Sequence, residues 1–262
     1  MANKKQTAVS QIISAITAKK KINRFDTEKF HFSVASDRRT REQAYRLAFE
    51  VYRERGLVLD APENMIVYPY DAASCAFTLL VTDRSSGTAA ATVTLVLDTP
   101  VHGLPSEEIY PQEITKLRSS ASRITEVTRL AICRRYRDDK ALLVMMTNIL
   151  SIFARRVWHA TDVVIEVNPN HQRFYERLYK YRKIGDTRQC TRVHNSPAVL
   201  MWMDADVQRK WIEKKAGISS TDAGEERVIY SHFRPLSEEK DVARTLKDQF
   251  RLMTEKEMEY FY

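Results

Sequence analysis

The stretch Arg123–Ile132, RITEVTRLAI, decides the fold. Most of its residues are β-branched or apolar, which is typical of a strand buried on both faces. A long and heavily apolar helix is predicted over 138–158, and a second buried strand, DVVIEVN, follows it at Asp162–Asn168. Strand, helix and strand in this order predict a right-handed parallel crossover at the centre of a sheet.

The segments on either side of this crossover predict that the sheet is mixed. Strands are predicted at 31–36, 76–82, 88–97, 183–193 and 198–203. Helices are predicted at 41–55, within 106–119, from Pro169 onward, and at 207–216 and 237–253. The first helix should stop at Gly56 and the last should have Ser237 as its N-cap. We therefore expect an α/β fold with a mixed central sheet flanked by helices and a helical C-terminal extension.

Composition limits the class of protein further. The chain has 262 residues, of which 44% are hydrophobic and 29% charged, with 6 Gly and 8 Pro. These values exclude low-complexity, collagen-like and disordered classes. The three Cys are far apart and form no CxxC pair, so we expect reduced, mostly buried thiols, with no disulfide framework and no metal site.

The chain divides into three parts. Residues 1–30 form an amphipathic arm, 31–205 the α/β domain and 206–262 the helical extension. The arm has no signal-peptide pattern, and the longest apolar stretch carries too many polar residues to span a bilayer. We therefore expect a cytoplasmic protein with no transmembrane segment, in which the arm is a candidate for peripheral membrane contact.

The formal net charge is +8, and the excess lies in the first 205 residues. An acidic macromolecule, either nucleic acid or an acidic carrier protein, would be attracted to such a surface, although a solvated basic face without a partner is an equal alternative. The basic clusters have no interleaved aromatic platform, which argues against nucleic acid. The candidate docking residues are Arg134, Arg135, Arg137, Arg155 and Arg156.

Three motifs carry a resemblance to known acyltransferases. The string Asn168–Leu178, NPNHQRFYERL, resembles the strand end and helix start of the GNAT N-acetyltransferase fold. The segment Thr125–Ile132, TEVTRLAI, is similar to the Glu-x-Ser-Arg-Phe-x-Val strand of the acyl-homoserine-lactone synthases. Arg46, Phe49 and Asp71 resemble positions near the N-terminus of those synthases. Over about residues 33–204 the sequence resembles the FeeM-like N-acyl amino acid synthases.

The resemblance implies an N-acyltransferase. It would move a long-chain fatty acyl group from acyl carrier protein to the α-amino group of an amino acid, by direct aminolysis of the thioester. No cofactor would be held permanently, because the phosphopantetheine of the carrier serves as the donor arm. Cys133–Lys140 lacks the glycines that bring backbone N–H groups close to a pyrophosphate, which argues against coenzyme A as the donor.

Three alternatives stay open. The first is a lactone synthase that uses S-adenosylmethionine; it is disfavoured because Leu57 lies in the stretch where such enzymes carry a Trp. The second is an acyltransferase that takes its acyl group from coenzyme A. The third is an inactive acyltransferase fold that binds nucleic acid.

The resemblance also implies roles for individual residues. Glu126 would be the general base for the amine, or else an ion-pair partner of Arg129 or Arg123. Arg129 would organise the site or contact the donor, or else form a structural pair with Glu126 or Asp71. Tyr175 would protonate the leaving thiolate, or else be a core tyrosine.

Substrate binding is assigned to three groups of residues. Arg46 and Asp71 would bind the carboxylate and ammonium of the amino acid, or else tie the first helix to the following loop. Backbone N–H groups from Thr128 to Leu130 would polarise the thioester carbonyl. An acyl tunnel, or else plain core, is predicted from the apolar residues Phe49, Leu142, Met145, Met146, Ile149 and Phe153.

Overall fold

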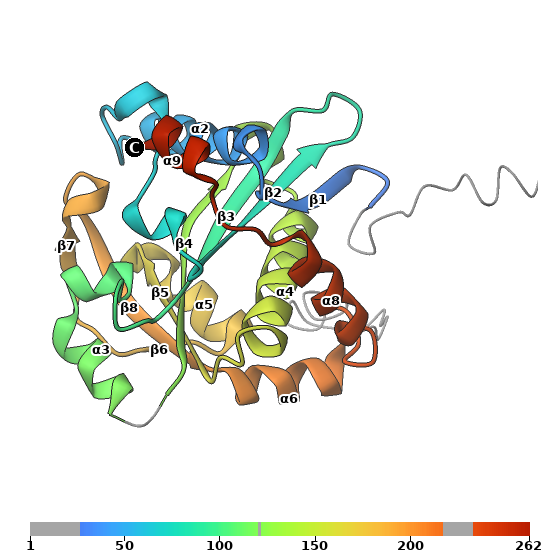
Figure 1. Ribbon diagram of the computed structural model, residues 1–262. Helices are drawn as coiled ribbons and strands as arrows, with labels where there is room; N and C mark the ends of the chain where they lie inside the picture. The colour runs from blue at the N-terminus through green and yellow to red at the C-terminus, as the bar shows by residue number, and fades with distance from the viewer. Residues whose placement is uncertain (1–26, 120–121, 217–232) are drawn as a thin grey trace, which may run out of the picture.

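The predicted mixed sheet is present in the computed structural model, which describes residues 27–119, 122–216 and 233–262 (Figure 1). Within these residues the strands lie in the order β1-β2-β3-β4-β5-β8-β6, and β7 pairs with the first residues of β8. β4 and β5 are parallel, and the other pairs are antiparallel. The strands are β1 (Phe30–Val34), β2 (Ala76–Asp83), β3 (Ala89–Leu97), β4 (Ile124–Ile132), β5 (Asp162–Val167), β6 (Arg182–Lys183), β7 (Arg188–Cys190) and β8 (Ser196–Asp204).

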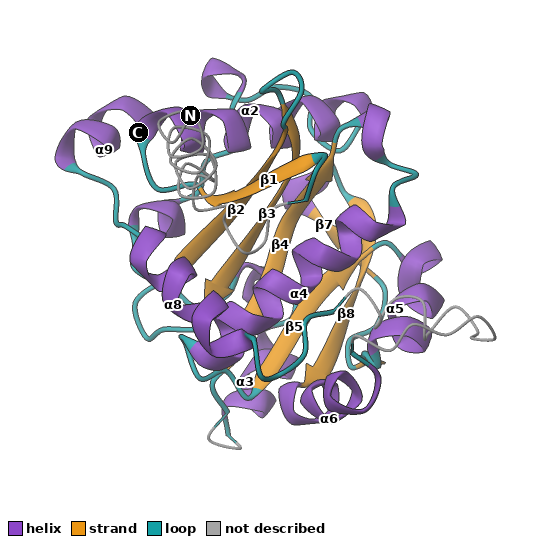
Figure 2. Ribbon diagram, turned by 90° about the vertical axis from the view of Figure 1, so that its right-hand side faces the viewer, coloured by secondary structure: helices purple, strands orange, loops and turns teal. Residues whose placement is uncertain are grey.

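Helices cover both faces of the sheet. α4, α5, α6 and α8 lie on one face, and α2, α3 and α9 lie on the other (Figures 1 and 2). The α-helices are α2 (Arg38–Glu54), α3 (Pro111–Arg118), α4 (Lys140–Arg156), α5 (Gln172–Tyr179), α6 (Ala205–Lys215), α8 (Glu239–Gln249) and α9 (Glu255–Phe261). The 3-10 turns are η1 (Pro62–Asn64), η2 (Pro69–Ala72), η3 (Pro105–Glu108), η4 (Arg134–Tyr136), η5 (Pro169–His171) and η6 (Thr191–Val193).

α2 shows how local sequence sets the ends of an element. The Asp37 side chain accepts the backbone N–H of Thr40 at 2.8 Å, and the Thr40 hydroxyl is 3.2 Å from the backbone N of Asp37. This reciprocal capping box satisfies N–H groups that have no partner inside the helix. At the other end Gly56 has a φ of 67°, which a glycine adopts without strain. The predicted stop at Gly56 is therefore confirmed.

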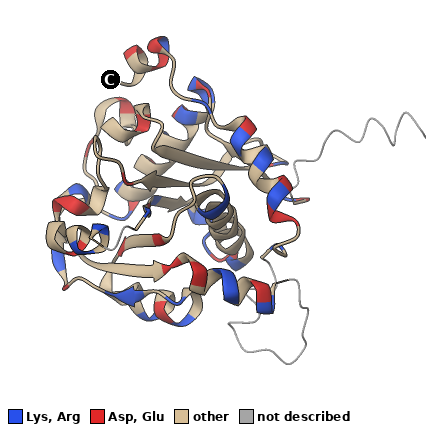
Figure 3. Ribbon diagram, turned by 60° about the horizontal axis from the view of Figure 1, so that its bottom comes forward, with Lys and Arg blue, Asp and Glu red and all other residues tan. Residues whose placement is uncertain are grey.

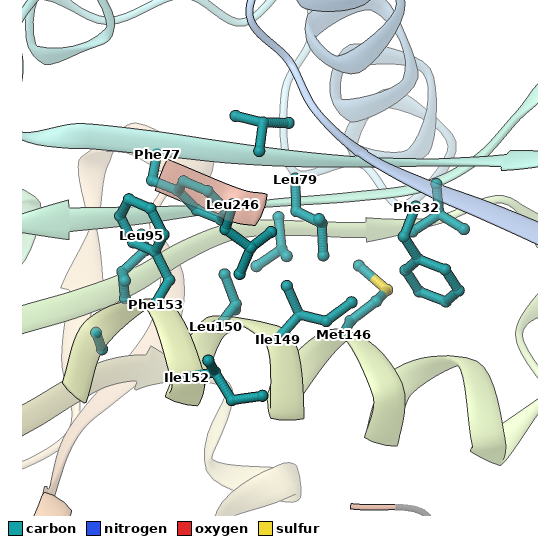
Figure 4. Close-up of a cluster of buried hydrophobic side chains, with 14 of the residues drawn as sticks. Phe32, Phe77, Leu79, Leu95, Met146, Ile149, Leu150, Ile152, Phe153 and Leu246 are labelled. Carbon is teal, nitrogen blue, oxygen red and sulfur yellow. The ribbon is translucent and has the colours of Figure 1, made fainter. Parts of the chain in front are cut away.

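The main core lies between the sheet and α4. Figure 4 shows side chains of β2 and β3 pointing at one face of α4, where Phe77 stacks on Phe153 with ring centroids 3.8 Å apart. α8 completes this core through Leu246, whose side chain is fully buried against the same cluster. Part of the predicted extension therefore packs into the same core as the α/β domain.

Several predictions about local structure are corrected. Ser237 is not the N-cap of the last predicted helix, because α8 begins after Glu238, whose side chain makes no capping bond. That helix ends at Gln249, and a further helix, α9, follows and packs Phe261 against Tyr45 of α2 at 5.4 Å. The strand predicted over 183–193 is two short strands, β6 and β7, separated by a loop.

Two predictions about the ends of the chain fall partly outside the described residues. The amphipathic arm lies there up to residue 26, and so do residues 217–232 of the predicted helical extension. No helix in the described ranges is both long enough and apolar enough to cross a membrane. Two of the three cysteines are buried, as predicted, and the third, Cys133, is partly exposed.

Leu246→Ala tests whether the C-terminal extension is part of the folding unit. Removal of this fully buried side chain should lower the free energy of unfolding by about 2–5 kcal/mol, because a cavity is left between α8 and α4. Urea unfolding followed by circular dichroism measures the change. Leu252→Ala is the matched control; its side chain is 53% exposed, and the change should stay below about 0.5 kcal/mol. Equal unfolding curves for the two variants would contradict this description of α8.

Candidate active site

β4 is interrupted by a bulge at its centre. Thr94 of β3 faces Thr128 and Thr92 faces Ala131, so two residues of β4, Arg129 and Leu130, stand opposite a single residue of β3. Arg129 has a φ of 53°, a left-handed conformation that costs a residue with a side chain about 1–3 kcal/mol. The surrounding structure must hold the bulge in place.

The Arg129 side chain provides that restraint. Its guanidinium donates to both carboxylate oxygens of Asp71, at 2.6 and 2.7 Å, and to the carbonyl of Ile66 at 2.8 Å and the hydroxyl of Thr94 at 2.7 Å. The Arg129 and Asp71 side chains are 2% and 0% exposed. Burial alone lowers the pKa of Arg129, but the Asp71 carboxylate and neighbouring groups hold it well above its ordinary value, so the guanidinium stays charged. The pairing with Asp71, one of the alternatives left open by the sequence, is the one that the structure forms.

The bulge separates β4 from β5. The parallel pairing begins at Ile124 and ends where Val127 faces Ile165, although β4 continues to Ile132 and β5 to Val167. Beyond that point β5 pairs only with β8 on its other side, within the part of the chain that the structure describes. The two central strands therefore open at the carboxyl end of β5.

An apolar cavity lies under this opening on the α4 face. It holds about 740 Å³ of empty space, part of it open to solvent. Its lining runs from Val167 and Tyr175 near the opening to Val163, Ala154 and Met203 at the other end of β5. Four residues of β5 separate these ends, which corresponds to about 13 Å along the strand. Over this length the lining is mainly apolar.

A second pocket, which carries charged groups, lies over the same opening on the α2 face. It holds about 790 Å³, again partly open to solvent. Tyr52, Arg55 and Leu57 at the end of α2 form one side, and Glu166 and Arg192 form the other. Both spaces share Thr128, Arg129, Leu130 and Val167 in their linings. A group placed between β4 and β5 would therefore touch an apolar cavity on one side and a charged pocket on the other.

Glu126 does not lie where a general base for the amine is required. Its side chain is fully buried and lies outside the lining of both spaces. Oε2 accepts the backbone N–H of Ser106 at 2.9 Å and its hydroxyl at 2.7 Å, so the predicted ion pair with Arg129 or Arg123 is not formed. Burial, with the negative charge of the neighbouring Glu166 acting in the same direction, raises the pKa of Glu126 to about 8. The carboxyl is mostly protonated at neutral pH.

Glu166 is the carboxylate that lines the charged pocket, and the sequence analysis missed it. It accepts from the Arg192 guanidinium through Oε2. The available signal was a single Glu among the apolar residues that follow Asp162 in this strand. Arg192 had no such signal, because only the β7–β8 turn brings it across to β5.

Tyr175 lies at the start of the apolar cavity, near the opening. Burial raises its pKa to about 12, so its hydroxyl is protonated at neutral pH. A protonated phenol at this place can donate a hydrogen bond to a leaving sulfur atom. Its ring also packs against Tyr181 with centroids 5.9 Å apart, so it serves the core as well.

The remaining predicted substrate residues are only partly brought to the opening. Thr128, Leu130 and Met146 line the apolar cavity. Arg46 bonds to Glu42 and to the carbonyl of Glu63 on the outer side of α2, and both carboxylate oxygens of Asp71 are taken by Arg129. These two do not form the predicted amino acid site. Five of the six residues predicted for the tunnel pack in the core outside the cavity lining, namely Phe49, Leu142, Met145, Ile149 and Phe153.

The predicted docking arginines fall into two groups. Arg155 and Arg156 both bond to the buried Glu239 of α8, and the Arg155 side chain is only 8% exposed, so its guanidinium is not presented at the surface. The other three lie in or beside η4, where Arg137 pairs with Glu54 at 2.7 Å. Figure 3 shows basic and acidic segments next to one another along several helices. Of the five predicted docking arginines, the exposed ones are Arg134, whose side chain is 83% exposed, and Arg135.

The chain is similar to known proteins in sequence family and in fold. The family described as N-acyl amino acid synthase FeeM matches residues 43–204. The solved structure of FeeM, an N-acyl amino acid synthase from uncultured soil microbes, is 20% identical and superimposes with a TM-score of 0.59 over 70% of this chain and 93% of that chain. The structure of the AHL synthase LasI is 15% identical, with a TM-score of 0.52 over 67% of this chain and 90% of that chain.

A third solved structure is that of BjaI, described as a COA-dependent acyl-homoserine lactone synthase with SAM and isopentyl-CoA. It is 16% identical and has a TM-score of 0.50 over 76% of this chain and 96% of that chain. At these identities the three structures show a shared fold. Among curated proteins none matches the chain.

Asp71→Asn tests the restraint on the bulge. The change removes the negative charge beside a buried guanidinium and should lower the free energy of unfolding by about 3–5 kcal/mol, as is usual when one partner of a buried ion pair is lost. Asp186→Asn is the control, since the Asp186 side chain is 94% exposed and 3.5 Å from Lys183, and its change should stay below about 0.5 kcal/mol. If urea unfolding shows Asp71→Asn to be as stable as Asp186→Asn, the pair does not hold the bulge.

Proposed function

Because this chain belongs to the FeeM N-acyl amino acid synthase family and is an N-acyltransferase, we propose that it transfers a long-chain fatty acyl group from acyl carrier protein to the α-amino group of an amino acid. The observation that carries the proposal is the opening between β4 and β5, with an apolar cavity on one side and a charged pocket on the other. The apolar cavity matches the polarity of a fatty acyl chain, and the charged pocket matches that of a zwitterionic amino acid.

The reaction needs the two substrates to meet at the opening. With the acyl chain in the cavity on the α4 face, the thioester carbonyl lies beside Thr128 and Leu130, where β4 has lost its pairing with β5. Backbone N–H groups that face such an opening can stabilise the negative charge that develops on the carbonyl oxygen. The sulfur atom then lies toward Tyr175, whose protonated hydroxyl can donate to the thiolate as it leaves.

The start of α4 supports a carrier-bound donor over coenzyme A. A diphosphate commonly binds the free N–H groups at a helix N-terminus. Here the Asp139 carboxylate accepts the N–H of Leu142 at 3.2 Å and pairs with Lys29 at 2.9 Å. The Asp139 carboxylate therefore occupies the position that a diphosphate would take at this helix N-terminus. The preceding loop, Cys133–Lys140, also lacks glycine. A phosphopantetheine arm without an attached nucleotide does not need this site.

The acceptor is proposed from the charges of the second pocket. Arg55 at the end of α2 can pair with the carboxylate of an α-amino acid, while the carboxylate of Glu166 lies on the opposite side of the pocket. Leu57 lines this pocket in the stretch where the lactone synthases are expected to carry a Trp. The lining therefore favours a free amino acid over S-adenosylmethionine.

The donor is tested by mass spectrometry of the reaction products. Purified protein is incubated with a mixture of amino acids and either long-chain acyl carrier protein or the matching acyl coenzyme A. The proposal expects an N-acyl amino acid with the carrier donor, formed at least about tenfold faster than with coenzyme A. Product formed equally well from both donors would contradict carrier dependence, and the absence of any acyl amide would contradict the function.

Arg134→Glu/Arg135→Glu tests carrier docking at η4. Reversal of these exposed charges should raise the KM for acyl carrier protein by about tenfold or more and leave the KM for the amino acid unchanged, because complementary charge mainly affects encounter. Arg39→Glu is the control: it lies at the opposite end of α2 from Glu54, about 20 Å along the helix axis. Equal KM values for the two variants would place the docking surface elsewhere.

A further inference from the structure

Two carboxyl groups lie close to the opening, and only one of them reaches it. Glu126 on β4 is closed off behind Ser106, whereas Glu166 on β5 lines the charged pocket. Both point to the same side of the sheet, since Glu126 faces Val164 in the parallel register and Glu166 is two residues further along β5. The carboxylate that a bound amine can meet is therefore on β5.

Glu166 stands at the point where the strands separate. The last paired residues are Val127 and Ile165, and Glu166 is the next residue of β5. Its neighbour Val167 lines both the charged pocket and the apolar cavity. A nucleophile held by the Glu166 carboxylate is thus beside the place where an acyl carbonyl would lie.

The two oxygen atoms of Glu166 have different surroundings. Oε2 is held by the Arg192 guanidinium, which also bonds to Glu108 at 2.9 Å and to the carbonyl of Pro105 at 2.5 Å. Oε1 is buried and has no hydrogen-bond partner among the described residues. Buried carboxylate oxygens are rarely left in this state, so Oε1 is a position where a bound N–H group would complete the structure.

We propose that Glu166 is the residue that binds the ammonium group of the acceptor through Oε1 and removes its proton. The inference deepens the proposed function and rests on it. Burial raises the pKa of Glu166 above its ordinary value, and the positive charge of Arg192 offsets only part of this rise. A raised pKa suits a carboxylate that acts as a general base. Arg192 is a positioning residue, because it fixes the orientation of the carboxylate without reaching the reacting atoms.

The reaction forms one C–N bond and breaks one C–S bond. One proton of the ammonium passes to Glu166 Oε1, and the freed lone pair of nitrogen attacks the carbonyl carbon to form the C–N bond. The C–S bond breaks and its electron pair leaves on sulfur. Of the two remaining N–H protons one stays on the amide and one ends on the thiol. Glu166 finally releases its proton to solvent.

Glu126 has a supporting part in this account. Since its pKa is raised to about 8, the group is mostly an uncharged carboxylic acid at neutral pH. A negative charge at Glu126 would raise the pKa of the nearby Glu166. It would also hinder the binding of the acceptor's carboxylate in the charged pocket. Glutamine has the same shape and is also uncharged, so it should replace Glu126 at little cost.

Three variants separate these roles at neutral pH with the carrier donor. Glu166→Gln should lower kcat by about 100-fold or more, the range typical for the loss of a general base, without changing the KM of the donor. Glu126→Gln should stay within about fivefold of the wild type. Glu108→Gln is the matched control, since it also removes a carboxylate from Arg192 but lies outside the pocket lining, and its kcat should equal that of the wild type.

Thermal unfolding of each variant shows whether the fold is kept. If Glu166→Gln does not fold, Glu166→Asp keeps the charge and withdraws the carboxylate by one methylene group, and it should still lose at least about tenfold in kcat. A folded Glu166→Gln enzyme within about fivefold of the wild-type kcat would overturn the inference. Wild-type protein that makes no acyl amide would instead overturn the proposed function, so the two failures are distinguishable.

Discussion

The buried ion pair between Arg129 and Asp71 holds the feature on which the site depends. It anchors a residue with a left-handed backbone in the middle of a strand, and this residue turns β4 away from β5. The pair is 58 residues apart in sequence and also connects η2 to the centre of the sheet. A sheet of this size gains stability from continuous pairing, so an interruption at its centre needs such a network of bonds to persist.

The opening divides the molecule into two chemical environments. On the α4 face the side chains are almost all apolar, and the long helix that makes the core also forms a wall of the cavity. On the α2 face the ends of α2, β5 and the β7–β8 turn bring together Arg55, Glu166 and Arg192. The two spaces share Thr128, Arg129, Leu130 and Val167 in their linings, so on the proposed function a thioester and an amine would meet there.

Much of the fold could be predicted from the sequence. The crossover at 123–168, the hairpin 76–97 and the capped helix α2 each have a strong local pattern, and the structure contains all three. α9 was missed because its seven residues have a weak apolar pattern, and its Phe261 is only partly buried, in contact with Tyr45 of α2. Such contacts between distant segments cannot be read from local periodicity.

The site was predicted less well, for a related reason. The resemblance pointed to Glu126, and the strand pattern does place it on the central strand, but only the packing of η3 shows that Ser106 closes it off. Glu166 could be recognised as a charged residue among the apolar residues of its strand. No local sequence pattern indicated that β4 would leave it uncovered. The bulge could not be predicted from a glycine in the sequence, because an arginine occupies the left-handed position.

The most direct test of the central claim is a crystal structure with a long-chain N-acyl amino acid bound. The product joins both substrates, so its position shows whether they meet between β4 and β5. The account predicts the acyl chain in the cavity beside Ala154 and Met203, the amide next to Thr128, and the amide N–H directed at Glu166. A product with its chain and its carboxylate on the same face of the sheet would contradict it.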